Sequence, residues 1–269
     1  MTNREPDAAK TILVTGSTSG IGLTTAQMLV ELGHHVVVHA RNQSRADEAK
    51  ANLNSPIVVG DLASMDETVA LAKVLRTFGR FDAVIHNAGI YEDNDRVETV
   101  DGLERTFQVN VVAPYLLTAL TPLPSRLIYL TSGMGDNGEI ALDDLQHERR
   151  QWSPTSAYRD SKLCDLAMAV AFARLYPGVS VTAVCPGWVQ TRMGGSSAPT
   201  DPRTGSATQV WLAASDDPAA QRTGRYMRHM RELPIPPSAA STSIQDGLIA
   251  ACTEITHVPP PAQPDQDKE

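Results

Sequence analysis

Residues 11–22 read TILVTGSTSGIG, a short apolar run followed by a turn rich in glycine, serine and threonine. The apolar part predicts a buried strand, and the periodic apolar residues after Gly20 predict a helix over about residues 20–32. Gly16 allows a tight turn, Gly20 lets a ligand approach the backbone, and Gly22 permits the helix to pack on the strand. A strand–turn–helix unit of this kind can bind a pyrophosphate, because the first N–H groups of the helix have no partner within it.

The same alternation of strand and helix continues along the chain. Further strands are predicted at 35–40, 56–61, 81–87, 126–131, 179–185 and 225–227, and further helices at 43–53, 65–78, 101–120, 156–175, 206–214 and 243–252. The pattern predicts an α/β fold: a single doubly wound Rossmann domain with a mainly parallel sheet and helices on both faces.

The domain is expected to span residues 11–255. Residues 1–10 are polar and predict a flexible N-terminus, and the proline-rich residues 256–269 predict a disordered tail. Residues 192–206 hold many glycines, serines and prolines without an apolar period, which predicts a mobile lid after a sheet strand.

Composition narrows the classes of partner. The net charge of −8 over 269 residues argues against nucleic acid, whose phosphates an acidic surface repels. The three cysteines, Cys164, Cys185 and Cys252, form no metal-ligand spacing, so we expect reduced, mostly buried thiols and no metal site. No apolar run approaches the length of a membrane span, and the N-terminus lacks a signal-peptide pattern, so a cytoplasmic location is expected.

The end of the second predicted strand bears on the choice of dinucleotide. It reads His39-Ala40-Arg41-Asn42, and no carboxylate follows until Asp47. In dinucleotide sites a carboxylate here binds the ribose 2′-hydroxyl of NAD, whereas an arginine binds the 2′-phosphate of NADP. Arg41, assisted by Arg45, therefore favours NADP over NAD. The alternative is an ordinary solvated arginine at a helix start.

The glycine spacing TG-x-x-x-G-x-G resembles that of the short-chain dehydrogenase/reductase family, and further motifs of the family follow in order over about residues 11–230. The resemblance implies that Asp61-Leu62 contacts the adenine, that Asn87-Ala88-Gly89 lies beside the cofactor, and that Pro186–Thr191 holds the nicotinamide side. With the turn and Arg41, the expected cofactor site comprises Gly16, Ser17, Thr18, Ser19, Gly20, Ile21, Gly22, Arg41, Asp61, Leu62, Asn87, Ala88, Gly89, Tyr158, Lys162, Pro186, Gly187, Val189 and Thr191.

The resemblance also implies a catalytic tetrad of Asn110, Ser132, Tyr158 and Lys162. Tyr158 and Lys162 are four residues apart on a predicted helix, so they share one face. A nearby ammonium would favour the phenolate of a tyrosine, whose ordinary pKa of about 10 makes it a weak acid–base group at neutral pH. Ser132 would hydrogen-bond the substrate oxygen, and the resemblance implies that Asn110 holds a water linking Lys162 to solvent.

Other features resemble the retinol dehydrogenase/protochlorophyllide reductase-like members: Ala40-Arg41-Asn42, the segment Asp143–Gln146, and the long gap between Ser132 and Tyr158. The chain departs from the family at His86, where asparagine is commoner. It departs again at 110–132, where a short segment interrupted by prolines replaces the helix that usually builds the dimer interface. A homo-oligomer therefore stays open as a possibility, but the usual interface through that helix is in doubt.

The substrate wall is expected to include Met134, Trp152, Trp188 and Met193, which flank the tetrad in sequence and could line an apolar pocket. The alternative is that they pack the insert at 133–154 and the lid against the core. Within the insert, His147 and Arg149-Arg150 are interpreted as a solvated face.

These features predict an NADP(H)-dependent oxidoreductase that moves a hydride between nicotinamide and a carbonyl or secondary alcohol of a small, moderately hydrophobic molecule. A reductase of an activated C=C bond is the alternative, because the same hydride and tyrosine could serve it. A non-catalytic NADP-sensing protein is a more remote alternative, since such family members generally lose the Tyr/Lys pair that is present here.

Overall fold

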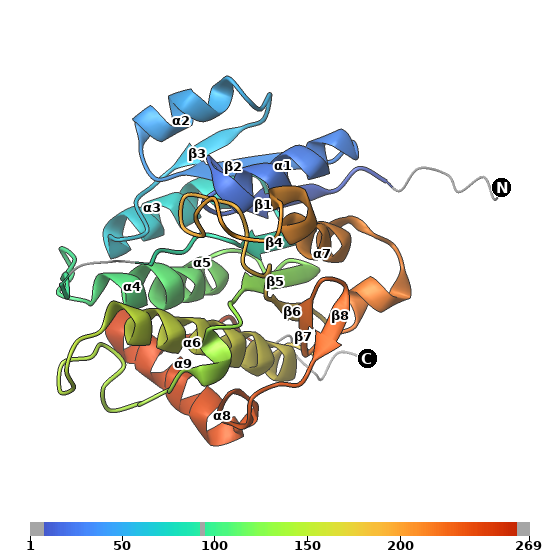
Figure 1. The fold of residues 1–269 in the computed structure, drawn as a ribbon. Helices are drawn as coiled ribbons and strands as arrows, with labels where there is room; N and C mark the ends of the chain where they lie inside the picture. The colour runs from blue at the N-terminus through green and yellow to red at the C-terminus, as the bar shows by residue number, and fades with distance from the viewer. Residues whose placement is uncertain (1–7, 92–94, 263–269) are drawn as a thin grey trace.

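The computed structural model describes residues 8–91 and 95–262 (Figure 1). Within them one sheet has the order β3-β2-β1-β4-β5-β6-β7-β8. Its strands are β1 (Thr11–Val14), β2 (His35–Ala40), β3 (Ile57–Val59), β4 (Ala83–His86), β5 (Arg126–Leu130), β6 (Ser180–Val184), β7 (Arg225–Arg228) and β8 (Arg231–Leu233). All neighbours pair in parallel except β7 and β8, which are antiparallel. The predicted doubly wound, mainly parallel sheet is confirmed, whereas strand β8 was not predicted.

The helices form a layer on each face of the sheet (Figure 1). They are α1 (Gly20–Glu31), α2 (Gln43–Lys50), α3 (Met65–Arg76), α4 (Arg105–Phe107), α5 (Ala113–Leu120), α6 (Pro154–Leu175), α7 (Pro202–Ala214), α8 (Pro237–Ala240) and α9 (Thr242–Thr256). Apolar residues of α1 and α7 make the core on one face, and those of α3, α5 and α6 make the larger core on the other. Helix α9 packs outside α6. Strand order reverses between β1 and β4, and the carboxyl ends of such strands border the usual ligand crevice of this fold.

The predicted helix 101–120 is wrong in its first turn. Gly102 has a φ of +73°, which breaks any helix there, and the helix begins only at Arg105. The buried Glu104 carboxylate caps this start by accepting hydrogen bonds from the next turn. Residues Gln108–Val112 then form a π-helical turn before α5. The helix therefore continues through Asn110, but with π-type instead of α-type hydrogen bonding there.

The predicted lid is shorter than 192–206, because α7 begins at Pro202. The carboxylate of Asp201 accepts hydrogen bonds from the N–H groups of Arg203 and Thr204, and proline suits the first position of a helix. The composition resembled a loop because capping residues and turn residues are the same types. A lid over 192–201 stays a prediction.

The predicted disordered tail is wrong for residues 256–262. The hydroxyl of Tyr115 donates to the carbonyl of Val258 at 2.8 Å, and that of Tyr176 donates to the carbonyl of Pro261 at 2.6 Å. The rest of the tail lies outside the described residues. So does most of the predicted flexible N-terminus, although Lys10 pairs with Asp216 at 2.8 Å.

The three cysteines are free and buried, as expected. Over residues 8–91 and 95–262, no helix has both the length and the apolar character that a membrane crossing requires.

Candidate active site

The glycine turn between β1 and α1 has the geometry that its sequence predicts. Gly16 and Gly20 have φ values of +61° and +56°, a region in which side chains are strained. A Cβ at Gly22 would overlap the carbonyl oxygen of Gly16 and the side-chain amide of Asn87. Ser19 does not cap α1 with its side chain, so the first N–H groups of the helix remain available. This uncapped, glycine-lined helix start fits the pyrophosphate of a dinucleotide.

Two polar residues hold the turn in place. The Thr15 hydroxyl accepts hydrogen bonds at 3.0 Å from the N–H groups of Asn87 and Ala88, which joins the turn to the N-A-G segment after β4. The buried His39 accepts from the N–H of Gly16 at 3.0 Å through Nδ1, while its Nε2 lies 2.8 Å from the carbonyl of Gly60. Burial lowers the pKa of His39, which favours this neutral form. Sequence reasoning missed His39; its only signal was a polar residue inside a valine-rich buried strand.

The residues expected at the adenine end lie along the edge formed by β2 and β3. Arg41 is exposed directly after β2, and none of the described carboxylates pairs with it. Arg45 differs, because its guanidinium binds Glu48 at 2.6 Å. The Asp61 carboxylate accepts from the N–H of Ala63 at 3.0 Å. The Leu62 side chain is buried in the core, so it can present only backbone to a ligand.

The Pro186–Thr191 segment reaches the glycine turn from the other side. A Cβ built at Gly20 would lie 3.4 Å from the methyl group of Thr191, so the two segments meet at the start of α1. Thr191 also accepts from the N–H of Gly194 at 3.1 Å, and the Val189 side chain is buried. These contacts place the two expected halves of the cofactor site together.

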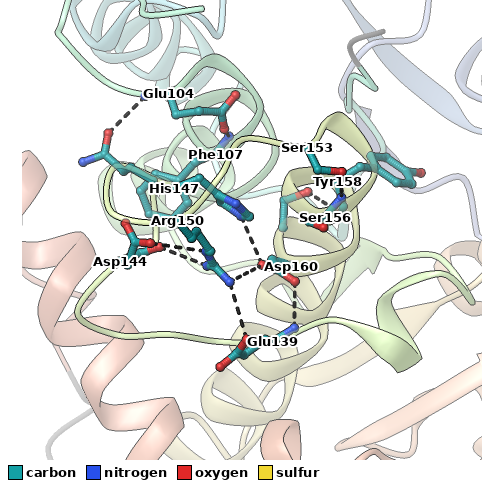
Figure 2. Close-up of polar contacts among 12 residues, drawn as sticks. Glu104, Phe107, Glu139, Asp144, His147, Arg150, Ser153, Ser156, Tyr158 and Asp160 are labelled. Carbon is teal, nitrogen blue, oxygen red and sulfur yellow. Dashed lines mark hydrogen bonds and ion pairs between the residues drawn. The ribbon is translucent and has the colours of Figure 1, made fainter. Parts of the chain in front are cut away.

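Tyr158 lies in the first turns of α6, whose N-cap is Ser153 and whose first residue is Pro154 (Figure 2). The ring is buried, at 8% exposure, and its centroid lies 4.8 Å from that of Tyr91. Burial raises the pKa of Tyr158, while the charge of Lys162 and a hydrogen bond with Ser132 oppose that rise. The structure therefore brings three members of the expected tetrad together, with the tyrosine protonated at neutral pH.

Lys162 is buried behind Tyr158, with its ammonium 5.9 Å from the centre of the ring. Nζ donates to the carbonyl of Leu130 at 3.0 Å and to the carboxylate of Asp165 at 2.8 Å. A Cβ built at Gly89 would lie 3.1 Å from Nζ, so the N-A-G turn passes close to the lysine because it ends in glycine. Sequence reasoning missed Asp165, since an acidic residue on a helix ordinarily indicates a solvated face.

Asn110 lies in the π-helical turn and joins two parts of the site. Its Oδ1 accepts from the N–H of Ile90 at 2.8 Å, and its Nδ2 donates to the carbonyl of Ile90 at 3.0 Å and to the hydroxyl of Ser161 at 2.9 Å. The amide thus ties the segment after β4 to α6. The water link through Asn110 stays a prediction.

The insert between β5 and α6 is fastened to α6 through Asp160. Figure 2 shows this network beside the helix, with the Tyr158 ring pointing away from it. Asp160 Oδ2 lies 3.1 Å from His147 Nε2 and 3.2 Å from Arg150, while Oδ1 accepts from the N–H of Glu139 at 2.7 Å. The interpretation of His147 and Arg150 as a solvated face is wrong: His147 is 3% exposed, and Arg150 is shared among acidic groups. Their carboxylate partners lie within the insert and in the first turns of α6, at spacings that follow no helical or strand period, so a sequence pattern could not reveal them.

The four expected pocket residues do not form one group. Met193 lies at the site, with its sulfur 3.9 Å from the Tyr158 hydroxyl. Trp188 is half exposed, and its indole donates to the carbonyl of Gly194. Trp152 packs edge-on against His147, which is the alternative role of holding the insert. Met134 follows the catalytic loop, where its N–H donates to the Ser132 hydroxyl at 3.2 Å.

The β7–β8 hairpin, which sequence reasoning did not connect with the site, forms another wall. A Cβ built at Gly187 would lie 2.9 Å from the ring of His229, and one built at Gly133 would lie 4.0 Å from the guanidinium of Arg228. His229 and Arg228 therefore lie beside loops that carry predicted site residues. A separate crevice of about 400 Å³, lined by Lys10, Asp82 and Arg126 among others, lies at the opposite, amino-terminal edge of the sheet.

Comparisons with known proteins agree with this geometry. A family model described as short chain dehydrogenase matches residues 10–202. The short-chain dehydrogenase chyC of Penicillium rubens is 37% identical over 257 residues, which cover 93% of this chain and 99% of that protein. Retinol dehydrogenase 14 of Mus musculus is 30% identical over 277 residues, covering 87% of this chain and 82% of that protein.

Among solved structures, a Shigella flexneri protein assigned as a short chain dehydrogenase and complexed with NADP is similar. It is 25% identical, has a TM-score of 0.66, and the match covers 84% of this chain and 100% of that one. The family model spans well over half of the chain, and the relatives match along most of their length. The chain therefore belongs to the short-chain dehydrogenase/reductase family, with retinol dehydrogenases among its relatives.

Proposed function

We propose that this chain is an NADP(H)-dependent oxidoreductase that moves a hydride between nicotinamide and a carbonyl or secondary alcohol carbon of a small, moderately hydrophobic substrate. Family membership supports a dehydrogenase or reductase role. One observation carries the finer proposal. Ser132, just after β5, meets Tyr158 and Lys162 in the first turns of α6, beside an uncapped helix start that fits a pyrophosphate.

The chain's own residues would supply binding, orientation and the proton. When bound, the cofactor supplies or accepts the hydride. Ser132 would donate a hydrogen bond to the substrate oxygen, where negative charge develops during reduction. Tyr158 would give its hydroxyl proton to that oxygen. Because burial raises the pKa of Tyr158, the proton is present at neutral pH, which favours the direction of reduction.

Lys162 would assist in two ways. Its ammonium lies close enough to the ring to stabilise the phenolate left after proton transfer, as the lowering effect of Lys162 on the pKa of Tyr158 indicates. Its position beside Gly89 also leaves it next to the segment expected to border the nicotinamide ribose. In the oxidation direction the same residues would act in reverse, with the phenolate as base.

The preference for NADP rests on Arg41. Its exposed guanidinium follows β2 without a carboxylate partner among the described residues, and it is free to bind a 2′-phosphate. The similar Shigella flexneri structure, which holds NADP, supports the same choice. A cytoplasmic location stays a prediction.

The test is NADPH and NADH consumption with aldehydes, ketones and quinones, run for the wild type and Tyr158→Phe. We expect turnover that prefers NADPH and falls about a hundredfold to ten-thousandfold in the variant, because that is the usual contribution of a general acid. NADPH binding, followed by its fluorescence, should change less than about twofold. Full turnover by Tyr158→Phe would refute the mechanism, and a saturated carbonyl product from an α,β-unsaturated aldehyde or ketone would identify the C=C alternative.

The sensor alternative has its own outcome in the same experiment. A protein that only senses NADP would bind it and turn over none of the panel. The buried contact between the Tyr158 ring and Lys162 argues against that role, because a sensor does not need a buried ammonium beside a phenol.

A further inference from the structure

Asp165 lies three residues after Lys162 on α6, and its carboxylate is buried against the ammonium of that lysine. The Nζ–Oδ2 distance is 2.8 Å, and the two side chains are 5% and 3% exposed. The other carboxylate oxygen, Oδ1, is buried and has no hydrogen-bond partner within the described part of the chain. The lysine is thus held between the carbonyl of Leu130 on β5 and a buried negative charge.

Burying this ion pair carries a large desolvation cost. Removing two charges from water costs several kcal/mol per ion, and their attraction repays it only when the remaining polar atoms are also satisfied. Here Oδ1 lacks a partner, and the Leu130 carbonyl already anchors the ammonium. Packing alone would be served by a neutral amide at position 165. The negative charge therefore calls for a role that an amide could not fill.

The other titratable groups near Asp165 leave Lys162 as its counter-ion. Burial raises the pKa values of Tyr129 on β5 and of Cys164 on α6 well above their ordinary ranges. His86 on β4 packs against Tyr129 in a tilted arrangement with ring centroids 4.8 Å apart, and burial lowers the pKa of His86 to about 3. These three groups are neutral at neutral pH, so they neither balance nor repel the carboxylate strongly.

We propose that Asp165 is a positioning residue of the active site: its carboxylate holds the Lys162 ammonium in place and charged, and so sets the upper pH limit at which Tyr158 can act as an acid. This inference rests on the proposed function, because it assigns Asp165 a part in the same proton transfer. Asp165 itself touches Lys162 and does not reach the reacting atoms.

Asp165→Asn is expected to lower the pKa values of both Lys162 and Tyr158. Burial has the largest single effect on Lys162 and lowers its pKa, but the charge and hydrogen bond of Asp165 together with the charge of Tyr158 more than offset it, so the pKa of the lysine should fall when the charge of Asp165 is removed. The charge of Asp165 also raises the pKa of Tyr158, although less than burial does, so removing it should lower the pKa of the tyrosine too. The first proton lost from the Tyr158–Lys162 pair should therefore leave at a lower pH.

The experiment is the pH profile of carbonyl reduction by the holoenzyme. In the wild type the rate should fall on the alkaline side as the pair loses its proton. With Asp165→Asn that fall should begin about one pH unit lower, which corresponds to an approximately tenfold lower rate at a fixed pH on the alkaline limb. Asp165→Glu, which keeps the charge, should move the limb back towards the wild-type position.

The matched control is Asp160→Asn, since Asp160 is a buried carboxylate on the same helix that binds His147 and Arg150 instead of Lys162. It should lower thermal stability without moving the alkaline limb. An alkaline limb of Asp165→Asn that coincides with the wild type, or one that Asp160→Asn moves equally, would overturn the proposal.

A second readout separates this proposal from the proposed function. The phenolate of Tyr158 in the cofactor-free protein can be followed by ultraviolet difference absorbance between Asp165→Asn and the double variant that also carries Tyr158→Phe. The phenolate should appear at lower pH than in the wild type measured against Tyr158→Phe, even if no substrate is turned over. If Asp165→Asn does not fold, Asp165→Ser leaves room for a water and takes its place in both measurements. Unchanged phenolate titration would refute the positioning role.

Discussion

The substitution His86→Gln tests how much of the acid sensitivity of this fold comes from one buried imidazole. His86 is 3% exposed at the end of β4, immediately before the N-A-G segment. Its Nε2 lies 2.9 Å from the hydroxyl of Thr118, and its Nδ1 has no partner among the described residues. Glutamine can place an amide nitrogen near the position of Nε2 and carries no titratable group in this pH range.

The magnitude follows from the pKa shift. Burial lowers the pKa of His86 from 6.5 to about 3. The unfolded chain therefore binds a proton below pH 6.5 that the folded chain refuses, and stability is lost as the pH falls from 6.5 towards 3. At about 1.4 kcal/mol per pH unit, lowering the pH to about 5 should cost roughly 2 kcal/mol from this residue. His39, whose pKa is also lowered by burial, adds a loss of the same sign.

The assay is urea unfolding of the wild type and His86→Gln at pH 7 and pH 5. Other ionisable groups contribute equally to both proteins, so they cancel in the difference between the two pH-dependent losses. The wild type should lose roughly 2 kcal/mol more than the variant over this range. The lost ring stacking on Tyr129 should lower the variant's stability at both pH values alike. Equal losses in the two proteins would refute the assignment of a buried neutral His86.

Three further outcomes are expected. In fluorescence titrations, Arg41→Ala should raise the Kd for NADPH about tenfold to a hundredfold and leave the Kd for NADH unchanged. Arg45→Ala should change neither Kd by more than about twofold, because the Arg45 guanidinium already binds a carboxylate. Gly22→Ala should lower the free energy of unfolding by about 1–3 kcal/mol or prevent folding, because its methyl group would overlap backbone, while Gly178→Ala, with open space around its Cβ, should be nearly neutral by urea unfolding. Light scattering should find a monomer, and a stable dimer would contradict this. Helix α9 packs along α6, and the tail after α9 covers the hydroxyl of Tyr115 on α5, the helix that usually builds the family's dimer interface.

The insert network gives the active site a support that neither motif nor spacing reveals. Asp160 is two residues from Tyr158 and from Lys162, yet it faces His147 and Arg150 instead of the cofactor crevice (Figure 2). One helix therefore carries the proposed acid on one side and the anchor of the insert on another.

Local pattern by itself determined the fold class, and the resemblance to the short-chain dehydrogenase/reductase family pointed to the residues of the expected tetrad. Valine-rich runs of four to six residues between glycine turns and amphipathic helices admit few arrangements other than a parallel sheet with helices on both faces. The glycines at 16, 20 and 22 predict a tight turn. The backbone has positive φ at Gly16 and Gly20, and at Gly22 it lies too close to Gly16 and Asn87 for a side chain. The pair Tyr158 and Lys162 shares a helix face for the simple reason of helical period.

Tertiary structure alone decided what surrounds those residues. His39 binds Gly16 and Gly60, which lie in other segments, whereas Asp165 pairs with Lys162 one helical turn earlier and is buried with it. A linear pattern shows neither the contacts of His39 nor the burial of Asp165. The docking of residues 256–262 depends on two distant tyrosine hydroxyls. The start of α7 at Pro202, by contrast, depends on the adjacent Asp201, a local cap that sequence reasoning took for part of a loop. Spacing along the chain records which side chains share a helix face, as Lys162 and Asp165 do, but their burial and therefore their charge depend on how other segments pack around them.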